Sequence, residues 1–186
     1  MSSVETVDAA FAGVRVVLSC DPSAVAEAKT FMTLLSDRRT PLADGAIIPL
    51  GFSHLVLREE HGVLVAHEPN YAGNPVIALR RDCTTTLAVH REMLAFANAR
   101  GVRPAFPRFA DTLNVRLGWA AATALDLQRD ERGWTVDFAG ATTAFGALRV
   151  YELLAARPTL LRLLALPVGC RVSVDGERVT QTKLAK

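Results

Sequence analysis

One stretch of the sequence decides the fold: Ala124-Leu125-Asp126-Leu127-Gln128-Arg129-Asp130-Glu131-Arg132-Gly133-Trp134-Thr135-Val136-Asp137-Phe138. Apolar and polar residues alternate on both sides of a charged turn, a pattern typical of half-buried strands. We therefore expect strands over Ala120–Gln128 and Trp134–Phe138, joined by the turn from Arg129 to Gly133. A leucine-rich segment from about Phe145 to Ala165 follows and predicts two short helices, closed by a loop at 166–169.

Turn and capping residues extend this interpretation along the chain. Asp21-Pro22 is a good helix start, and Asp175-Gly176 is a strong hairpin turn. We expect residues 1–10 to be frayed. The other expected elements are strands over Val14–Ser19, Val76–Leu79 and Thr112–Leu117, helices over Asp21–Ser36 and from Asp82 or Thr84 to Arg100, and hairpins formed by Ser53–Glu59 with Val63–Glu68 and by Cys170–Val174 with Arg178–Thr182.

Several hairpins with separate helices predict an α+β fold, built on a mostly antiparallel sheet with helices packed on it. The 186 residues are half hydrophobic, which is enough for a substantial core. We expect a single domain over residues 1–186. A small N-terminal subdomain over residues 1–45 is the alternative.

The charge and apolar patterns narrow the classes of partner. The net charge is only +2, with 9 basic and 11 acidic residues in the first 100 and 12 and 8 in the remainder. No basic run indicates nucleic-acid binding. No apolar run is long enough for a membrane span or an export signal, so we expect a cytoplasmic protein without a membrane partner.

Candidate catalytic and metal-binding residues are few. If His61-Gly62 is the turn of the hairpin, Val56 lies opposite His67, and His54 lies diagonally across from His67. A metal site formed by His54, His67, His90 and Glu68 is the specific hypothesis. Their spacing matches no metal-ligand motif, so we predict neither a metal nor a cofactor.

Cys83 and the tryptophans each allow two interpretations. A thiol near a helix start can be activated, but seven residues separate Cys83 from His90, which is about 10 Å along a helix. We therefore expect Cys83 to be a small buried side chain rather than a nucleophile. Trp119 and Trp134 flank the central strands, and they indicate either core packing or contact with a partner.

The second half carries a resemblance to a known family. Arg132-Gly133-Trp134 opens a strand, and the proline- and leucine-rich segment 158–169 closes with Pro167-Val168-Gly169. Over about residues 115–175 the sequence resembles bacterial immunity proteins of polymorphic toxin systems, in the group numbered thirty-three. Part of that group was first described as a domain of unknown function.

The resemblance implies a protein that binds and neutralises a cognate cytosol-acting toxin rather than an enzyme. We place the expected partner contacts in two charged turns. The first is the hairpin tip, with Arg58, Glu59, Glu60 and His61, and the second is the turn with Arg129, Asp130, Glu131 and Arg132. The alternatives are a small cytosolic enzyme or ligand-binding domain without a recognisable motif, and a structural or homo-oligomeric module.

Overall fold

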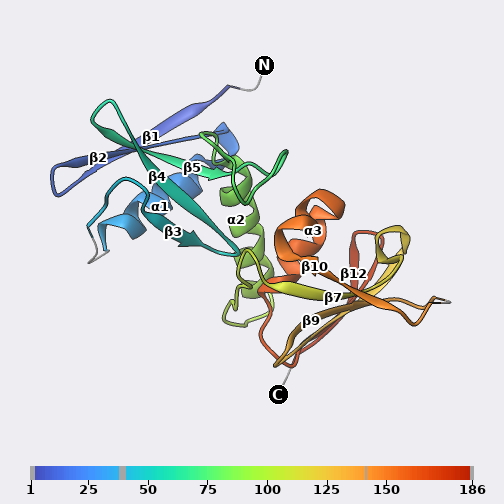
Figure 1. Cartoon of the computed structure of the whole chain (residues 1–186). Helices are drawn as coiled ribbons and strands as arrows, with labels where there is room; N and C mark the ends of the chain where they lie inside the picture. Colours follow the sequence, from blue (N-terminus) through green and yellow to red (C-terminus); the bar gives the residue numbers. More distant parts are fainter. Residues whose placement is uncertain (1–2, 38–40, 141, 185–186) are drawn as a thin grey trace. The chain divides into compact units, whose positions relative to one another are not determined.

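The computed structural model describes residues 3–37, 41–140 and 142–184. It divides into two compact units, residues 1–91 and residues 92–186, each with its own six-stranded sheet (Figure 1). The helix α2 (Thr84–Asn98) runs across the division.

In the first unit the sheet has the strand order β1-β2-β5-β4-β3. The hairpin β1–β2 precedes the helix η1–α1, and the antiparallel strands β3, β4 and β5 follow it. β2 and β5 are parallel neighbours, and the short β6 pairs with the end of β5. The bounds are β1 Glu5–Phe11, β2 Val14–Cys20, η1 Pro22–Ala24, α1 Val25–Ser36, β3 Ile47–Leu50, β4 Ser53–Glu60, β5 Val63–Pro69 and β6 Leu79–Arg80.

The core of the first unit lies between one face of this sheet and α1. Alternate residues of the strands meet the apolar stripe of α1, which includes Phe31 and Leu35. On β5 the same alternation puts Leu64, Ala66 and then Glu68 on the core face. The alternation therefore buries one carboxylate beside the aliphatic side chains.

In the second unit the sheet has the order β10-β7-β9-β8-β11-β12, with β7 and β9 parallel. The helix α3 lies over one face of it (Figure 1). The bounds are β7 Thr112–Arg116, η2 Trp119–Ala121, β8 Ala124–Asp130, β9 Gly133–Asp137, β10 Phe145–Arg149, α3 Val150–Ala156, η3 Pro158–Ala165, β11 Arg171–Asp175 and β12 Arg178–Lys183.

The two faces of the second sheet differ sharply. Buried apolar residues of β7, β8, β9 and β11 alternate with exposed or half-buried polar ones. The buried set includes Leu113, Leu127, Trp134 and Val172, and the helical segment α3–η3 supplies further buried leucines. Most side chains of the opposite face are polar or charged, which is typical of an antiparallel sheet covered on one side only.

The α+β prediction is confirmed, and most strand neighbours are antiparallel. Both hairpins form, and the register Val56↔His67 is as expected. His61 and Gly62 have φ of +52° and +81°, as a two-residue hairpin turn requires. Asp21 caps the first helix by accepting the Ser23 N–H. The single domain over residues 1–186 stays a prediction. Residues of the suggested subdomain 1–45 share the first core with residues 48–87.

Four expected elements were wrong. Residues 5–11 form β1, because β2 pairs with all seven of them. Residues 76–77 lie in a turn, and only Leu79–Arg80 is extended. The strand expected over Ala120–Gln128 begins at Ala124, since η2 occupies 119–121. Phe145–Arg149 is a strand rather than helix, because it pairs with β7, and α3 begins only at Val150.

Candidate functional site

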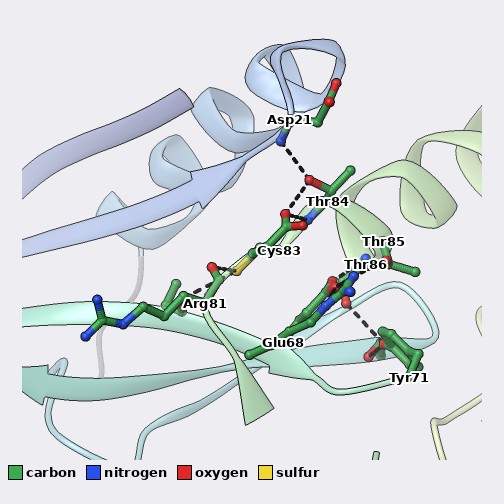
Figure 2. Close-up of polar contacts among 12 residues, drawn as sticks. Asp21, Glu68, Tyr71, Arg81, Cys83, Thr84, Thr85 and Thr86 are labelled. Carbon is green, nitrogen blue, oxygen red and sulfur yellow. Dashed lines mark hydrogen bonds and ion pairs between the residues drawn. The ribbon is translucent and has the colours of Figure 1, made fainter. Parts of the chain in front are cut away.

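The most concentrated polar cluster of the first unit surrounds Glu68 (Figure 2). Its carboxylate is fully buried and accepts the Thr86 N–H at 2.6 Å. Arg80, directly opposite on β6, donates to the other carboxylate oxygen through Nε at 2.7 Å, and its Nη2 also donates to Thr85. Burial raises the pKa of Glu68, while the Thr86 N–H and Arg80 oppose the rise. This carboxylate satisfies the first turn of α2 and ties β5 to β6.

Three hydroxyl groups extend the cluster. Tyr71 Oη lies 2.5 Å from Ser53 Oγ and 3.1 Å from Thr86 Oγ1, and the Tyr71 ring packs beside Phe52. Burial raises the pKa of Tyr71 to about 12. The cluster holds the start of α2, the start of β4 and the loop after β5 in one arrangement.

The raised pKa of Tyr71 gives a direct test of this arrangement. We expect a tyrosine step at about 12 in an absorbance titration of the native protein. The folded state favours the neutral phenol. The contribution of Tyr71 to the free energy of unfolding is therefore fully present below pH 10, and it falls as the pH rises towards 12. Tyr71→Phe should remove the step and Tyr151→Phe should keep it. A Tyr71-dependent step near pH 10 would contradict the buried hydroxyl network.

Cys83 lies at the α2 start, beside this cluster. It is fully buried, and its thiol donates to the Ala66 carbonyl at 3.4 Å. Burial, with the nearby Glu68 and Asp82 carboxylates, raises the pKa of Cys83 well above its usual value. The thiol therefore stays protonated, which is the opposite of what a nucleophile needs. The interpretation of Cys83 as a buried small side chain is confirmed.

The histidines do not gather into a metal site. His67 Nε2 lies 3.2 Å from the Glu60 carboxylate, and its Nδ1 lies 3.1 Å from the Val65 carbonyl. Burial lowers the pKa of both His54 and His90. Over residues 3–37, 41–140 and 142–184, no group of three or more His, Cys, Asp or Glu side chains is arranged to hold a metal ion.

The predicted hairpin tip lies at the β4–β5 turn. Arg58, Glu59 and His61 are exposed there. Glu60 is different, because its carboxylate pairs with both His67 and Arg81. Asp44 supports the tip from the preceding loop by accepting the Glu59 N–H at 2.9 Å. The tip is thus a charged surface whose backbone is held in place by Asp44. Its contact with a partner stays a prediction.

The second predicted turn separates into two kinds of residue. Asp130, Glu131 and Arg132 are exposed at the β8–β9 turn. Arg129 instead points to the buried face, where Nη1 donates to the carbonyls of Ala105 and Leu166 at 2.5 Å each. Alternation along β8 could have revealed this, because Arg129 follows the buried Leu125 and Leu127 at a spacing of two. Arg129 organises the unit, and the other three remain available for contact.

Ion pairs hold the charges of the open sheet face in place. Arg116 on β7 donates to the Asp137 carboxylate on β9, and its guanidinium lies 5.1 Å from the Phe145 ring on β10. Arg171 and Ser173 on β11 donate to Asp126 on β8 at 2.9 and 2.5 Å. These donors lower the pKa of Asp126 and Asp137, so both stay ionised near neutral pH.

The face is hollowed where β7, β9 and β10 meet the β8–β9 turn. A concavity of about 420 Å³ adjoins the β8–β9 turn, and a second of about 360 Å³ lies on the other side of that turn. The larger one includes Asp130 and Arg132 from the turn, Thr135 from β9, Asn114 from β7 and Ala147 from β10. Sequence reasoning placed the turn but missed the strand residues, because only the register Asn114↔Thr135 and Ala147↔Asn114 brings them together.

Fold and site together define an α+β protein with an open, charge-paired sheet face in its second unit. The sequence matches no family model, and comparison with curated proteins and with solved structures gives no significant match either. Among the described residues, no helix is long and apolar enough to cross a membrane.

Proposed function

We propose that this protein works by binding another protein and that its partner is a cytosol-acting toxin, which it neutralises. The toxin as partner rests on the resemblance of residues 115–175 to immunity proteins. The mode of action, binding through a surface, is supported by the open face of the second sheet, which includes the turn Asp130–Arg132. The observation that carries the proposal is the concavity of about 420 Å³ in that face.

The chemistry of this face suits a protein partner. Charges of both signs are fixed in pairs, so they can orient an approaching surface without a large net field. Asn114 and Thr135 at the centre offer hydrogen-bonding groups, and the concavity can accept one large side chain of the partner. The exposed carboxylates and Arg132 at the turn form the rim, where charge mainly sets the rate of association.

A capture experiment followed by a growth test examines the function itself. The tagged protein is used to capture partners from its native lysate, and each captured protein is then expressed alone and together with this chain. We expect one stoichiometric partner that stops growth when expressed alone and is tolerated when co-expressed. A stable partner without toxicity would contradict the toxin proposal but leave the binding face to be tested.

A single substitution tests the face. Asn114→Arg places a long charged side chain in the middle of the concavity, and we expect it to weaken partner binding about tenfold or more, measured by calorimetry. Asn98→Arg is the matched control, because Asn98 is an exposed residue at the end of α2. If both variants unfold at the same temperature as the natural protein and bind the partner equally well, the partner binds another surface.

A further inference from the structure

The strands at the ends of the two sheet paths, β1, β3, β10 and β12, differ in how they resist pairing with another chain. β3 carries Pro49, which has no N–H to donate, and β1 carries the charges of Glu5 and Asp8. β12 has Arg178 and Lys183 at its ends and a register shift against β11. Such features are the usual protection of an exposed edge. Within the described residues, the run 145–148 of β10 has none of them and keeps an unbroken register with β7.

The direction of the β10 backbone groups follows from its pairing. Leu117 N–H donates to the Ala144 carbonyl at 2.9 Å, and Val150 N–H donates to the Asp111 carbonyl at 3.0 Å. Hydrogen-bonded and non-bonded pairs alternate in an antiparallel ladder, so the even-numbered residues of β10 face β7. Phe145 and Ala147 therefore direct their N–H and C=O groups to the open edge. The Arg149 N–H is already taken by the Glu152 carboxylate at 2.6 Å.

Apolar side chains flank this open edge. Phe145 is 40% exposed and belongs to the polar face, while Leu117 is 51% exposed and lies close to Gly146. The ladder alternation places Leu117 on the opposite face from Phe145. An added strand would therefore cover one large apolar side chain on each face, besides taking up the free backbone groups.

We propose that β10 pairs with β10 of a second copy of this chain, antiparallel and about a two-fold axis at Gly146. In this register Phe145 of each copy lies opposite Ala147 of the other, and these residues exchange their free N–H and C=O groups. Gly146 meets Gly146 at the axis, where the close approach of a non-bonded pair suits a residue without a side chain. Phe145 packs over the small Ala147 side chain, and no like charges face each other.

The pairing joins the two second-unit sheets into one continuous sheet. Opposite residues of an antiparallel pair project to the same face, so the open polar faces of both copies lie on one side. The proposed dimer thus doubles that face without using the residues of the β8–β9 turn. Gly146 and Ala147 also line the larger concavity, but the pairing is tested by self-association alone, without the proposed partner.

The mass of the purified protein in solution tests the pairing. Sedimentation or light scattering over a concentration series should show the mass rising from 20.1 kDa towards twice that value. Ala147→Pro removes an edge N–H but no bond to β7, and it should weaken self-association about tenfold or more. Ala147→Val is the matched control, of similar size and with its N–H retained, and it should associate as the natural protein does.

Phe145→Lys is a second variant for the case in which the proline disturbs folding. It adds a charge of the kind that protects natural edges, and it should also abolish the increase in mass. A constant mass of 20.1 kDa at the highest concentration would overturn the proposal. Undiminished association of Ala147→Pro and Phe145→Lys would overturn it as well, because it would place the dimer contact on another surface.

Discussion

Replacing Glu68 by leucine is expected to lower the free energy of unfolding by about 3–5 kcal/mol, the usual result of breaking a buried ion pair from one side. The substitution leaves the Thr86 N–H without its acceptor and Arg80 without its carboxylate. Leucine fits the apolar surroundings, so the loss would come from the two orphaned partners rather than from a cavity. Urea unfolding followed by far-ultraviolet circular dichroism measures the change.

Two further variants separate charge from hydrogen bonding at Glu68. Glu68→Gln keeps an acceptor for the Thr86 N–H but loses the charge facing Arg80. Its free energy of unfolding should therefore lie between those of the natural protein and Glu68→Leu. Glu92→Leu, at an exposed position of α2, should stay within about 0.5 kcal/mol of the natural protein. Hydrogen exchange should locate the Glu68→Leu effect in β5 and the first turn of α2. A Glu68→Leu protein as stable as Glu92→Leu would show that the cluster contributes no stability.

Local signals in the sequence predicted the elements that local chemistry determines. The His61-Gly62 turn fixed one hairpin, since a tight turn sets the register of the strands that it joins. The Asp175-Gly176 signal located the other hairpin, but Asp175 still pairs with Arg178, and the two turn residues are Gly176 and Glu177. The Asp21-Pro22 pair fixed the start of the first helix. In these places the residues that cause the structure are neighbours in the chain.

The missed elements depend on partners far away in the sequence. Gly146 and Ala147 have low strand propensity, and the leucine-rich run after them favours helix. Residues 145–149 are nevertheless a strand because β7, about thirty residues earlier, offers five partners in register. Tertiary pairing overrode propensity there. β1 is a different case, since Val7, Ala9 and Phe11 recur at a spacing of two and pack against the core, so its strand pattern was present in the sequence.

The buried Glu68 and the half-buried Arg129 each have a signal in the sequence that could have placed them. Glu68 follows Leu64 and Ala66 at a spacing of two, as Arg129 follows Leu125 and Leu127. Strand alternation alone places both on a core face. A charge at such a position needs an internal partner, which here is Arg80 for Glu68 and backbone carbonyls for Arg129. The concavity at Asn114 had no comparable signal, because it depends on the parallel register of β7 and β9.

The second large effect is expected at Arg129. Its guanidinium donates to the carbonyls of Ala105 and Leu166 and lies 5.9 Å from the Trp134 ring, so it satisfies the carbonyl that ends η3. Arg129→Met keeps the aliphatic stem and removes the donors. We expect the free energy of unfolding to fall by about 2–4 kcal/mol, because charge-assisted hydrogen bonds to part-buried carbonyls are lost. Both tryptophans lie in the second unit, so their fluorescence during urea unfolding reports the change there.

Arg132→Met is the matched control on the same turn. Arg132 is exposed, so its removal should change stability by no more than about 0.5 kcal/mol while slowing association with the partner. The two arginines should therefore show opposite behaviour, with stability depending on Arg129 and binding on Arg132. Equal losses of stability would contradict the inward role of Arg129. Unchanged association by Arg132→Met would remove this turn from the proposed contact surface, because a rim charge that leaves the association rate unaltered is not facing the partner.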